Sequence, residues 1–557
     1  MQLEYFHMID RIVDLKVDEK TIVVEAQVPK ESTIFEGHFP GYPLMPGVLL
    51  IESMAQASGW LQLGVFKFER MPILAAVKEA KVRGSVFPGD LMSIEARLTH
   101  EGSGYAMTEA KIRVGGKLRA NFGTHLHADP LPQCGYALAH GRDRQARRIS
   151  ATGRIDMIDT PASKPGQTEV WITGIGLATS LGEGLDANWA ALQEKRINVD
   201  EKGFAPYIVH PLMPVAFDSQ IPKKGDQRQM EAWQRIGTYA AGLALDSAGI
   251  KGNKDILSKI DMVVAAGGGE RDLNVDSGVL TAEAKGANAP GFLNERLMSD
   301  LRPTLFLAQL SNLLAGNIAI VHGLGGTSRT FMGEEVAGAD SARIALARIA
   351  SGESDIALVG GSHNGERKDL LVLYEFGDFN LKNKFAPVWA RKDHAGFALG
   401  SAGAFLVLES KTHAEARGAK PFAKLSSVVA DLAKRKRPGD MAATLEKLWA
   451  KLPKREGKGA IITGATGAEP ATSEERDFLK SHADFPVRST GTVFGHAMET
   501  QFPLGIALAA LSISRGALFP PNDSTGTEIE MQGAPTQIVV VGAGHWRGEG
   551  MALVEAI

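Results

Sequence analysis

A histidine and a nearby glutamate could form an acid–base pair. His38 lies in the loop EGHFPGYPLMPG, residues 36–47, and Glu52 is the only acidic residue in the apolar stretch 48–66 that follows. An ionised carboxylate in such a stretch is costly unless it is paired, so burial is expected to raise its pKa. A histidine beside a desolvated carboxyl group could move two protons. The alternative is a histidine satisfied in the core and a glutamate bonded to backbone.

Strands and one helix must position this pair. Segments 20–28, 92–98, 105–114 and 118–128 alternate apolar and polar residues, which is typical of half-buried antiparallel strands. Residues 48–66 are too long for a strand and predict a buried helix wrapped by the sheet. We therefore expect an α+β domain over residues 1–130.

The motif around His38 resembles a known family. EGHFPGYPLMPGVLLIESMAQASG, residues 36–59, and YFHMIDRI, residues 5–12, resemble the hot-dog-fold (3R)-3-hydroxyacyl-acyl-carrier-protein dehydratases of the FabZ type. The resemblance implies that His38 and Glu52 are the catalytic pair, contributed to each site by two chains of a dimer. It also implies an acyl chain carried on the phosphopantetheine of an acyl-carrier protein as substrate.

The resemblance assigns a role to each residue of the site. His38 would take the proton alpha to the thioester, while Glu52, kept protonated by burial, would help the hydroxyl leave as water. The Gly47 amide at the helix start would polarise the thioester carbonyl. Gln56, one helical turn beyond Glu52, would either orient it or serve a structural role.

From residue 168 the pattern changes to α/β. Short apolar strands, several of them running into glycine, are predicted at 170–176, 262–269, 355–361, 403–409, 458–464, 536–544 and 550–557, with helices such as 342–352 between them. The pair DIALVGG and GAFLVLE is echoed by QIVVVGAG and GMALVEAI. This repetition indicates an internal duplication of one α/β unit.

Residues 168–557 resemble the β-ketoacyl-acyl-carrier-protein synthases of the thiolase fold. The similarity is carried by residues 316–361, by WITGIG, RIGTYAAGLALDSAGI and GFALGSAGAFLVLE, and by STGTVFGH at 489–496. In that family a cysteine at a helix N-terminus is the nucleophile. The resemblance implies a duplicated, layered α/β domain that follows the hot-dog domain.

The synthase-like domain lacks most of that family's catalytic groups. The nucleophile position maps to Glu335, the first histidine to about Ala465 and the lysine to Gly491, whereas His496 is retained. The glycine-rich loop that usually carries a phenylalanine gate reads GAGHWR, residues 542–547. We therefore expect no condensation by this chain alone. A carboxylate at position 335 would be stabilised by helix-terminal amides and could close the pocket as a structural cap.

Residues 131–167 are expected to form a linker. Prolines bracket a stretch that is rich in arginine and has little apolar periodicity, and the single cysteine, Cys134, lies in it. The composition favours a solvated connector over a surface for anionic partners. One cysteine makes neither an internal disulfide nor a thiolate metal cluster, so no metal or cofactor is predicted.

Composition excludes further classes of protein. The 557 residues carry 61 basic and 64 acidic side chains, a net charge of −3, without the basic excess that nucleic acids demand. No stretch reaches the ~18 apolar residues of a membrane span, and the first ten residues lack a basic leader region. We expect a soluble, cytoplasmic protein.

The expected function is dehydration of (3R)-3-hydroxyacyl-acyl-carrier protein to the trans-2-enoyl form. The whole chain resembles the proteins that elongate the very long acyl chain of lipid A, which implies a homodimer or higher oligomer and an active β-ketoacyl synthase as partner of a noncatalytic synthase-like domain. Two alternatives stay open: a malonyl decarboxylase in the second domain, or an acyl-chain-binding scaffold without catalysis. Loss of the first histidine and the lysine speaks against the former, and intact His38 and Glu52 against the latter.

Overall fold

The computed structural model divides the chain into two compact units, Met1–Lys164 and Pro165–Ile557. The structure describes residues 7–30, 32, 34–35, 38, 42–67, 70–101, 105–130, 168–286, 289–301, 305, 309–391, 395–453 and 457–557. The expected linker 131–167, with Cys134, lies outside the described residues.

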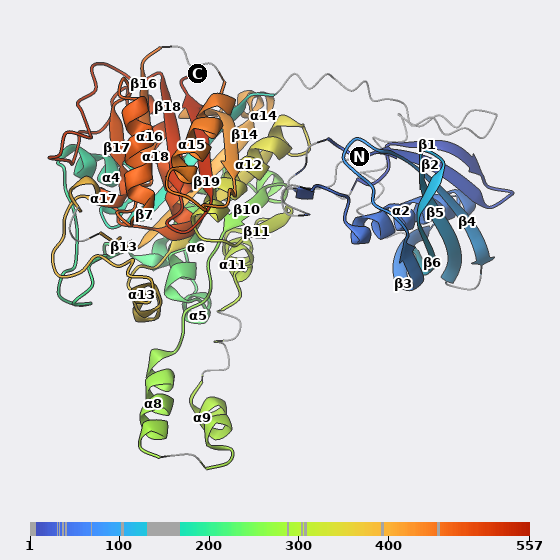
Figure 1. Ribbon diagram of the computed structural model, residues 1–557, viewed down its shortest axis with the longest axis horizontal. Helices are drawn as coiled ribbons and strands as arrows, with labels where there is room; N and C mark the ends of the chain where they lie inside the picture. Colours follow the sequence, from blue (N-terminus) through green and yellow to red (C-terminus); the bar gives the residue numbers. More distant parts are fainter. Residues whose placement is uncertain are drawn as a thin grey trace. The chain divides into compact units, whose positions relative to one another are not determined.

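The N-terminal unit is an antiparallel sheet that packs against one long helix (Figure 1). The strand order is β1-β2-β4-β5-β6-β3, and every neighbouring pair is antiparallel. The elements are β1 Arg11–Lys16, β2 Thr21–Gln27, α2 Gly47–Val65, β3 Arg70–Val82, β4 Leu91–Glu101, β5 Tyr105–Val114 and β6 Lys117–Pro130. This arrangement is the α+β domain that the alternating pattern predicted, and it has the hot-dog fold that the family resemblance implied.

Alternation along β4 shows why the sheet has one apolar face. Met92, Ile94, Ala96 and Leu98 are buried, and the residues between them are more exposed. They share a core with the buried face of α2, which includes Leu50, Met54 and Leu61. A period of two on the strand and of 3.6 on the helix brings both apolar faces together.

The predicted helix is present and packs against the sheet, but it is not buried on every face. Helix α2 buries one face only, and Val48 is 70% exposed while Glu52 and Gln56 are half-buried. These three residues are spaced four apart, so they share the face of the helix that turns away from the core. The catalytic candidate Glu52 therefore lies at the surface of the single chain rather than inside it.

The C-terminal unit is built on one sheet whose two halves repeat each other. The order is β11-β10-β12-β14-β7-β15-β19-β18-β16-β17, with β8 paired to β7. The strands are β7 Val170–Thr179, β8 Gly182–Glu183, β10 Asp261–Ala265, β11 Ser328–Phe331, β12 Ile356–His363, β14 Ala402–Ser410, β15 Ala423–Asp431, β16 Gly459–Thr463, β17 Val487–Ser489, β18 Gln537–Ala543 and β19 Glu549–Glu555. Strands β9 Val209–His210 and β13 Leu399–Gly400 form a separate pair.

The sheet confirms the internal duplication. In one half β10 is parallel to β11 and β12, and β14 is antiparallel to β12 and β7. In the other half β16 is parallel to β17 and β18, and β19 is antiparallel to β18 and β15. The antiparallel pair β7 and β15 joins the halves. The echoed segments DIALVGG/GAFLVLE and QIVVVGAG/GMALVEAI thus occupy equivalent strands.

Helices form the remaining layers of this unit. Helices α12 Glu335–Ala350 and α18 Gln501–Ser514 pack together and contact strands of both halves, and α18 is apolar and buried nearly all round. Helices α6 Ala232–Ser247 and α11 Leu313–His322 pack together over one half, and α15 Asp440–Lys451 and α16 Ala471–Ser481 over the other. Shorter helices are α4 Gly184–Gln193, α5 Lys224–Gln229, α7 Lys254–Leu257, α13 Lys368–Glu375, α14 Lys411–Ala416 and α17 Thr490–Val493, with 3-10 turns at Phe217–Ser219, Val388–Ala390 and Met498–Thr500.

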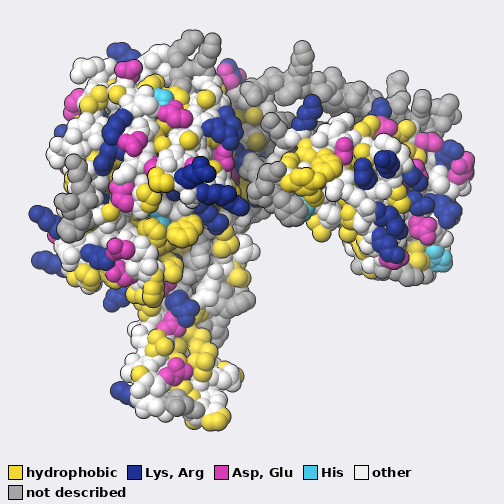
Figure 2. Space-filling model, viewed as in Figure 1, with side chains coloured by type: hydrophobic (Ala, Val, Ile, Leu, Met, Phe, Trp, Pro, Cys, Tyr) yellow, Lys and Arg dark blue, Asp and Glu magenta, His cyan; other side chains and the backbone are white. Residues whose placement is uncertain are grey.

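Helices α8 Leu273–Ala284 and α9 Phe292–Asp300 project from the body of the C-terminal unit (Figure 1). Apolar side chains are visible along this projection, whereas acidic and basic side chains are interspersed on the visible face of the body (Figure 2). In the described part of the chain, no helix combines the length and the apolar character that crossing a membrane requires.

Candidate functional site

His38 is held by hydrogen bonds on both sides. Its amide donates to Ile34 O at 3.1 Å, and its carbonyl accepts from the Leu44 amide at 2.9 Å. The ring Nδ1 lies 3.1 Å from Leu44 O. A proton on Nδ1 makes this contact a hydrogen bond and leaves the lone pair on Nε2, which is the state that a general base needs.

Gln56 fixes the carboxyl group of Glu52. Gln56 Nε2 donates to Glu52 Oε1 at 2.9 Å, and Gln56 Oε1 accepts from the Met8 amide at 3.1 Å. The amide side chain therefore cannot turn without losing one of the two bonds. The spacing of one helical turn produces this contact, and the chain before β1 supplies its second anchor.

Gly47 begins α2 directly after Pro46, which provides no side-chain cap. A Cβ at position 47 would lie 3.3 Å from Val82 Cγ2, so glycine lets the helix start lie against the end of β3. First-turn amides of a helix have no partners within the helix. An amide at this place can donate to an anionic or polarised oxygen.

Glu335 is the first residue of α12 and is buried, with 6% exposure. Its Oε1 accepts hydrogen bonds from His496 Nε2 at 2.8 Å, from His545 Nδ1 at 2.7 Å and from the His545 amide at 3.1 Å. Among the described residues, the hydrogen bonds to this carboxylate come from two distant segments rather than from the amides of its own helix. The expected role of Glu335 as a structural cap on the pocket stays a prediction. The preceding residue, Glu334, has a φ of 58°, a strained value for a residue with a side chain.

Burial and charge act against each other in this cluster. Burial raises the pKa of Glu335, but the adjacent His545 and His496 hold it well below its usual value. Burial lowers the pKa of His545, and the negative charge of Glu335 more than reverses this. The two groups therefore favour an ion pair inside the domain.

Two further titratable groups flank the cluster, and sequence reasoning missed both. Burial, reinforced by the charge of Glu335, raises the pKa of Glu499 to about 7. Burial, together with the charge of Arg367, lowers the pKa of His363 to about 3. His363 Nδ1 lies 3.9 Å from Glu499 Oε2.

Aromatic rings enclose the histidines. The Phe397 ring lies 4.9 Å from His496 and 5.3 Å from His545, measured between centroids, and the Phe379 ring lies 4.9 Å from His545. These rings limit the access of water to the cluster, which strengthens its electrostatic interactions.

The positions matched to the first histidine and the lysine are closed. Ala465 is fully buried, and a Cβ on Gly491 would lie 2.2 Å from Ala465 O. A lysine at position 491 therefore requires the backbone to move apart. The structure joins Glu335 with His496 and packs Gly491 on Ala465.

His545 is the functional candidate that sequence reasoning missed most clearly. It lies in the glycine-rich loop 542–547, where the family resemblance implies a phenylalanine gate. The signal that the sequence offered was a histidine in this loop together with a carboxylate at the position matched to the nucleophile. Glu335, His496 and His545 each offer one possible metal-ligand atom, and these atoms lie within 4.8 Å of one another.

Comparisons with known proteins separate the two units. Residues 1–122 match the FabA-like domain family, and residues 167–414 match the family of the β-ketoacyl synthase N-terminal domain. A 3-hydroxyacyl-[acyl-carrier-protein] dehydratase FabZ of Rhizorhabdus wittichii is 38% identical over 128 residues, which cover 22% of this chain and 80% of that protein. A bifunctional LpxC/FabZ enzyme of Chlorobaculum tepidum is 39% identical over 115 residues, which cover 20% of this chain and 24% of that protein.

Solved structures resemble the C-terminal unit in fold. The ishigamide ketosynthase/chain length factor aligns with a TM-score of 0.59 and 21% identity, covering 70% of this chain and all of that one. A β-ketoacyl synthase from Burkholderia phymatum aligns with a TM-score of 0.58 and 19% identity over the same shares. Through its N-terminal unit the chain belongs to the FabZ family of 3-hydroxyacyl-[acyl-carrier-protein] dehydratases, and it carries that domain fused to a β-ketoacyl-synthase-like domain.

Proposed function

We propose that the N-terminal unit removes water from a (3R)-3-hydroxyacyl thioester carried on an acyl-carrier protein, with His38 and Glu52 as the reacting pair. The observation that carries this proposal is the placement of both side chains by their own anchors, His38 against Leu44 O and Glu52 against Gln56. The 38% identity to a FabZ dehydratase supports the same reaction.

The proposed reaction moves two protons. His38 Nε2 takes the proton from the carbon alpha to the thioester, and the electron pair forms the double bond to the beta carbon. The carbon–oxygen bond at the beta carbon breaks, and the Glu52 carboxyl proton leaves with the hydroxyl as water. The Gly47 amide polarises the thioester carbonyl while negative charge develops on it. Proton exchange with solvent returns His38 and Glu52 to their starting states.

The half-exposed face of α2 supports a homodimer. Val48 and Glu52 turn away from the core of their own chain, and a dehydrating carboxyl group has to be kept from water to stay protonated. A second copy that covers this face would supply the missing burial. The proposed site therefore takes one residue of the pair from each chain.

The direct test mixes the full-length protein with a (3R)-3-hydroxyacyl-acyl-carrier protein and follows the unsaturated thioester by ultraviolet absorption and mass spectrometry. We expect loss of one water from the acyl chain, and the reverse hydration when the trans-2-enoyl form is supplied. Absence of both reactions in folded protein, with a known FabZ active under the same conditions, would refute the proposal.

We further propose that the synthase-like unit is a noncatalytic partner of an active β-ketoacyl synthase, in elongation of the very long acyl chain of lipid A. Glu335 stands at the nucleophile position and is engaged by His496 and His545. Gly491 packs on Ala465 where the related enzymes carry a lysine and a histidine. A malonyl decarboxylase is less well supported, because the enolate would lack those two groups.

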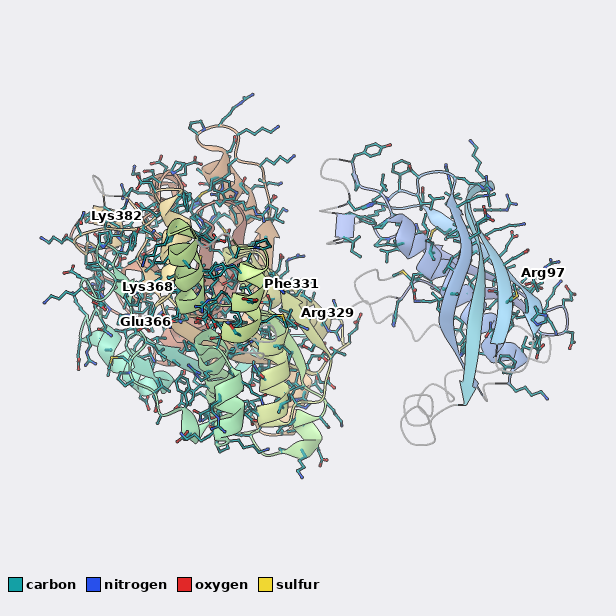
Figure 3. All side chains as sticks on the ribbon, turned by 90° about the horizontal axis from the view of Figure 1, so that it is seen from below. Arg97, Arg329, Phe331, Glu366, Lys368 and Lys382 are labelled. Carbon is teal, nitrogen blue, oxygen red and sulfur yellow. The ribbon has the colours of Figure 1, made fainter. Side chains whose placement is uncertain are left out.

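Exposed elements of this unit support association. Strand β11 ends the described sheet, with Arg329 and Phe331 on it (Figure 3), and the adjacent Met332 is 64% exposed. Ile320 on α11 and Met298 on α9 are 75% and 79% exposed. An open sheet edge next to an exposed apolar side chain, such as β11 with Met332, is a surface that pairs readily with another chain.

Affinity purification of the tagged full-length protein from its own cells tests the partnership. We expect recovery of a β-ketoacyl synthase that retains its cysteine, together with an acyl-carrier protein. As a control, the cells are cross-linked under conditions that trap a known synthase pair. Recovery of the acyl-carrier protein without any synthase under these conditions would contradict the partner proposal and leave the dehydratase assignment intact.

A further inference from the structure

Three buried side chains from distant parts of the chain meet at the modified synthase position. Glu335 begins α12, His496 follows α17, and His545 lies between β18 and β19. Their exposed fractions are 6%, 1% and 6%. The sequence separations are 161 residues between Glu335 and His496 and 210 between Glu335 and His545. Only the tertiary fold creates this cluster.

The hydrogen bonds of the cluster are unevenly distributed. Three donors converge on Glu335 Oε1, whereas Glu335 Oε2 is buried and has no hydrogen-bond partner among the described residues. His496 Nδ1 is also buried and has no hydrogen-bond partner among the described residues. Buried polar atoms in folded proteins are nearly always satisfied. The lone pairs on Glu335 Oε2 therefore leave coordinating capacity that the described side chains do not use.

The donor set suits a divalent transition metal. Two imidazole nitrogens and one carboxylate oxygen are the ligands of many zinc sites, and imidazole also suits copper, iron and nickel. The two nitrogens lie 2.8 and 2.7 Å from the shared oxygen. Bonds of about 2.0–2.2 Å in tetrahedral geometry hold ligand atoms roughly 3.3 Å apart. These ligand atoms would reach that spacing if they moved apart by about half an ångström, or if Glu335 coordinated through Oε2 instead of Oε1.

The surroundings supply part of the charge balance and a shield from water. Glu335 contributes a buried carboxylate to the cluster. The aromatic rings of Phe397 and Phe379 surround the histidines. A dication in the cluster would be partly balanced by this carboxylate and shielded from water.

We propose that Glu335, His496 and His545 bind one divalent transition metal ion, with Zn²⁺ as the ion best suited to the donor set. The ion displaces the protons on the two imidazole nitrogens and ties the start of α12 to the two loops. It holds the former nucleophile position closed, so its role is structural.

Calorimetric titration of the chelator-treated full-length chain with Zn²⁺ tests the site. We expect one equivalent to bind in the wild type and a loss of at least tenfold in affinity in Glu335→Gln and in His545→Gln. The control is His413→Gln, because His413 Nδ1 also lies 2.7 Å from a carboxylate, that of Glu409, but does not belong to the three-ligand cluster. This variant should bind Zn²⁺ like the wild type.

Titration of the wild type with Co²⁺ gives a readout that needs no variant. A four-coordinate site of nitrogen and oxygen ligands gives intense visible absorption, which Zn²⁺ should abolish by displacement. Circular dichroism checks that each variant is folded. Absence of stoichiometric binding by the wild type would overturn the proposal, and so would equal affinity in folded Glu335→Gln and wild type.

Discussion

At the scale of single residues, the proposed exchange of a nucleophile for a carboxylate at position 335 has a physical consequence. A thiolate at a helix N-terminus is activated by the positive end of the dipole, whereas the Glu335 carboxylate is engaged by His496 and His545. Under the proposed noncatalytic role, this exchange removes the covalent intermediate, and the hydrogen bond from His496 to Glu335 occupies the retained histidine.

Restoring the thiol should not restore condensation. In Glu335→Cys the new side chain is expected to react with iodoacetamide. The wild type is the control, because its labelling measures the reaction of Cys134 alone. Elongation of an acyl primer from malonyl-acyl-carrier protein should stay absent, because Ala465 and Gly491 cannot activate the donor. Mass spectrometry of the acyl products checks this. Condensation by the variant without a partner would show that the catalytic positions are misassigned.

The dehydratase site gives a second prediction at this scale. His38→Ala and Glu52→Gln should each lower the dehydration rate by about two decades or more, the usual loss when a general acid or base is removed. Gln56→Ala should cost less, because it leaves the Glu52 carboxyl group present but unanchored. Initial rates on a (3R)-3-hydroxyacyl-acyl-carrier protein measure the effect. Wild-type rates in folded His38→Ala and Glu52→Gln would refute the assignment.

At the scale of elements, glycines decide how closely helices approach the sheet. A Cβ on Gly176 in β7 would lie 2.0 Å from Ala240 O in α6. Gly176→Ala should therefore destabilise the C-terminal unit by about 3 kcal/mol or more, since the overlap involves backbone that cannot rotate away. Gly225→Ala in α5 is the control, because no heavy atom of the described residues, apart from its own chain neighbours and helix backbone, lies within 4 Å of its added Cβ. It should be neutral or slightly stabilising.

Urea unfolding monitored by tryptophan fluorescence measures these effects, because all seven tryptophans except Trp60 belong to residues 168–557. Equal midpoints for Gly176→Ala and Gly225→Ala would contradict the close packing of α6 on β7.

The contact of α16 with β16 depends on pH. Burial raises the pKa of Glu475 to about 7, and its carboxyl group accepts a hydrogen bond from Thr463. Because the folded pKa lies above the unfolded value of 4.5, the folded state binds the extra proton. The stabilisation contributed by protonated Glu475 is thus fully present below about pH 4.5 and is lost as the pH rises toward 7.

Glu475→Gln should therefore be more stable than the wild type at pH 8, by roughly 3 kcal/mol, and similar to it below the unfolded pKa. Urea midpoints measured across this range check the sign. A variant that is less stable than the wild type at pH 8 would contradict the pKa assignment.

At the scale of the whole molecule, the proposed reaction and the proposed partnership belong to different units. Deleting residues 168–557 should leave dehydration in vitro largely intact, since His38, Glu52, Gln56 and their anchors all lie in the N-terminal unit. In cells the same deletion should shorten or abolish the very long acyl chain. The acyl-length profile of lipid A measures this. An unchanged profile, with the remaining unit expressed normally, would refute the partner proposal.

The homodimer proposal gives a test on the same scale. Heterodimers of His38→Ala with Glu52→Gln contain one site with both native residues if the pair is shared between chains. We expect partial recovery of dehydration when the two inactive variants are mixed and allowed to exchange. Lack of recovery in verified heterodimers would contradict a shared site.

Local pattern was enough to predict most of the fold. The strands at 105–114 and 118–128 and the helix at 48–66 have periodicities that their own residues determine, and the structure places β5, β6 and α2 there. Strands β1 and β3 were missed. β1 is short and contains a register shift, and β3 is the last strand of the sheet and carries Pro72, which is compatible with an edge position.

The sequence by itself determined the α+β and α/β classes of the two units and the duplication, because residue type and spacing carry these features. The family resemblance added the predictions that His38 and Glu52 form a catalytic pair and that Glu335 replaces a nucleophile. Tertiary structure alone decided the rest. It left Glu52 half-exposed on the outer face of α2, and it brought His545 into contact with Glu335, 210 residues away in the sequence. The physical reason is that burial and long-range hydrogen bonds depend on how elements pack, and periodicity along one segment does not specify its neighbours in space.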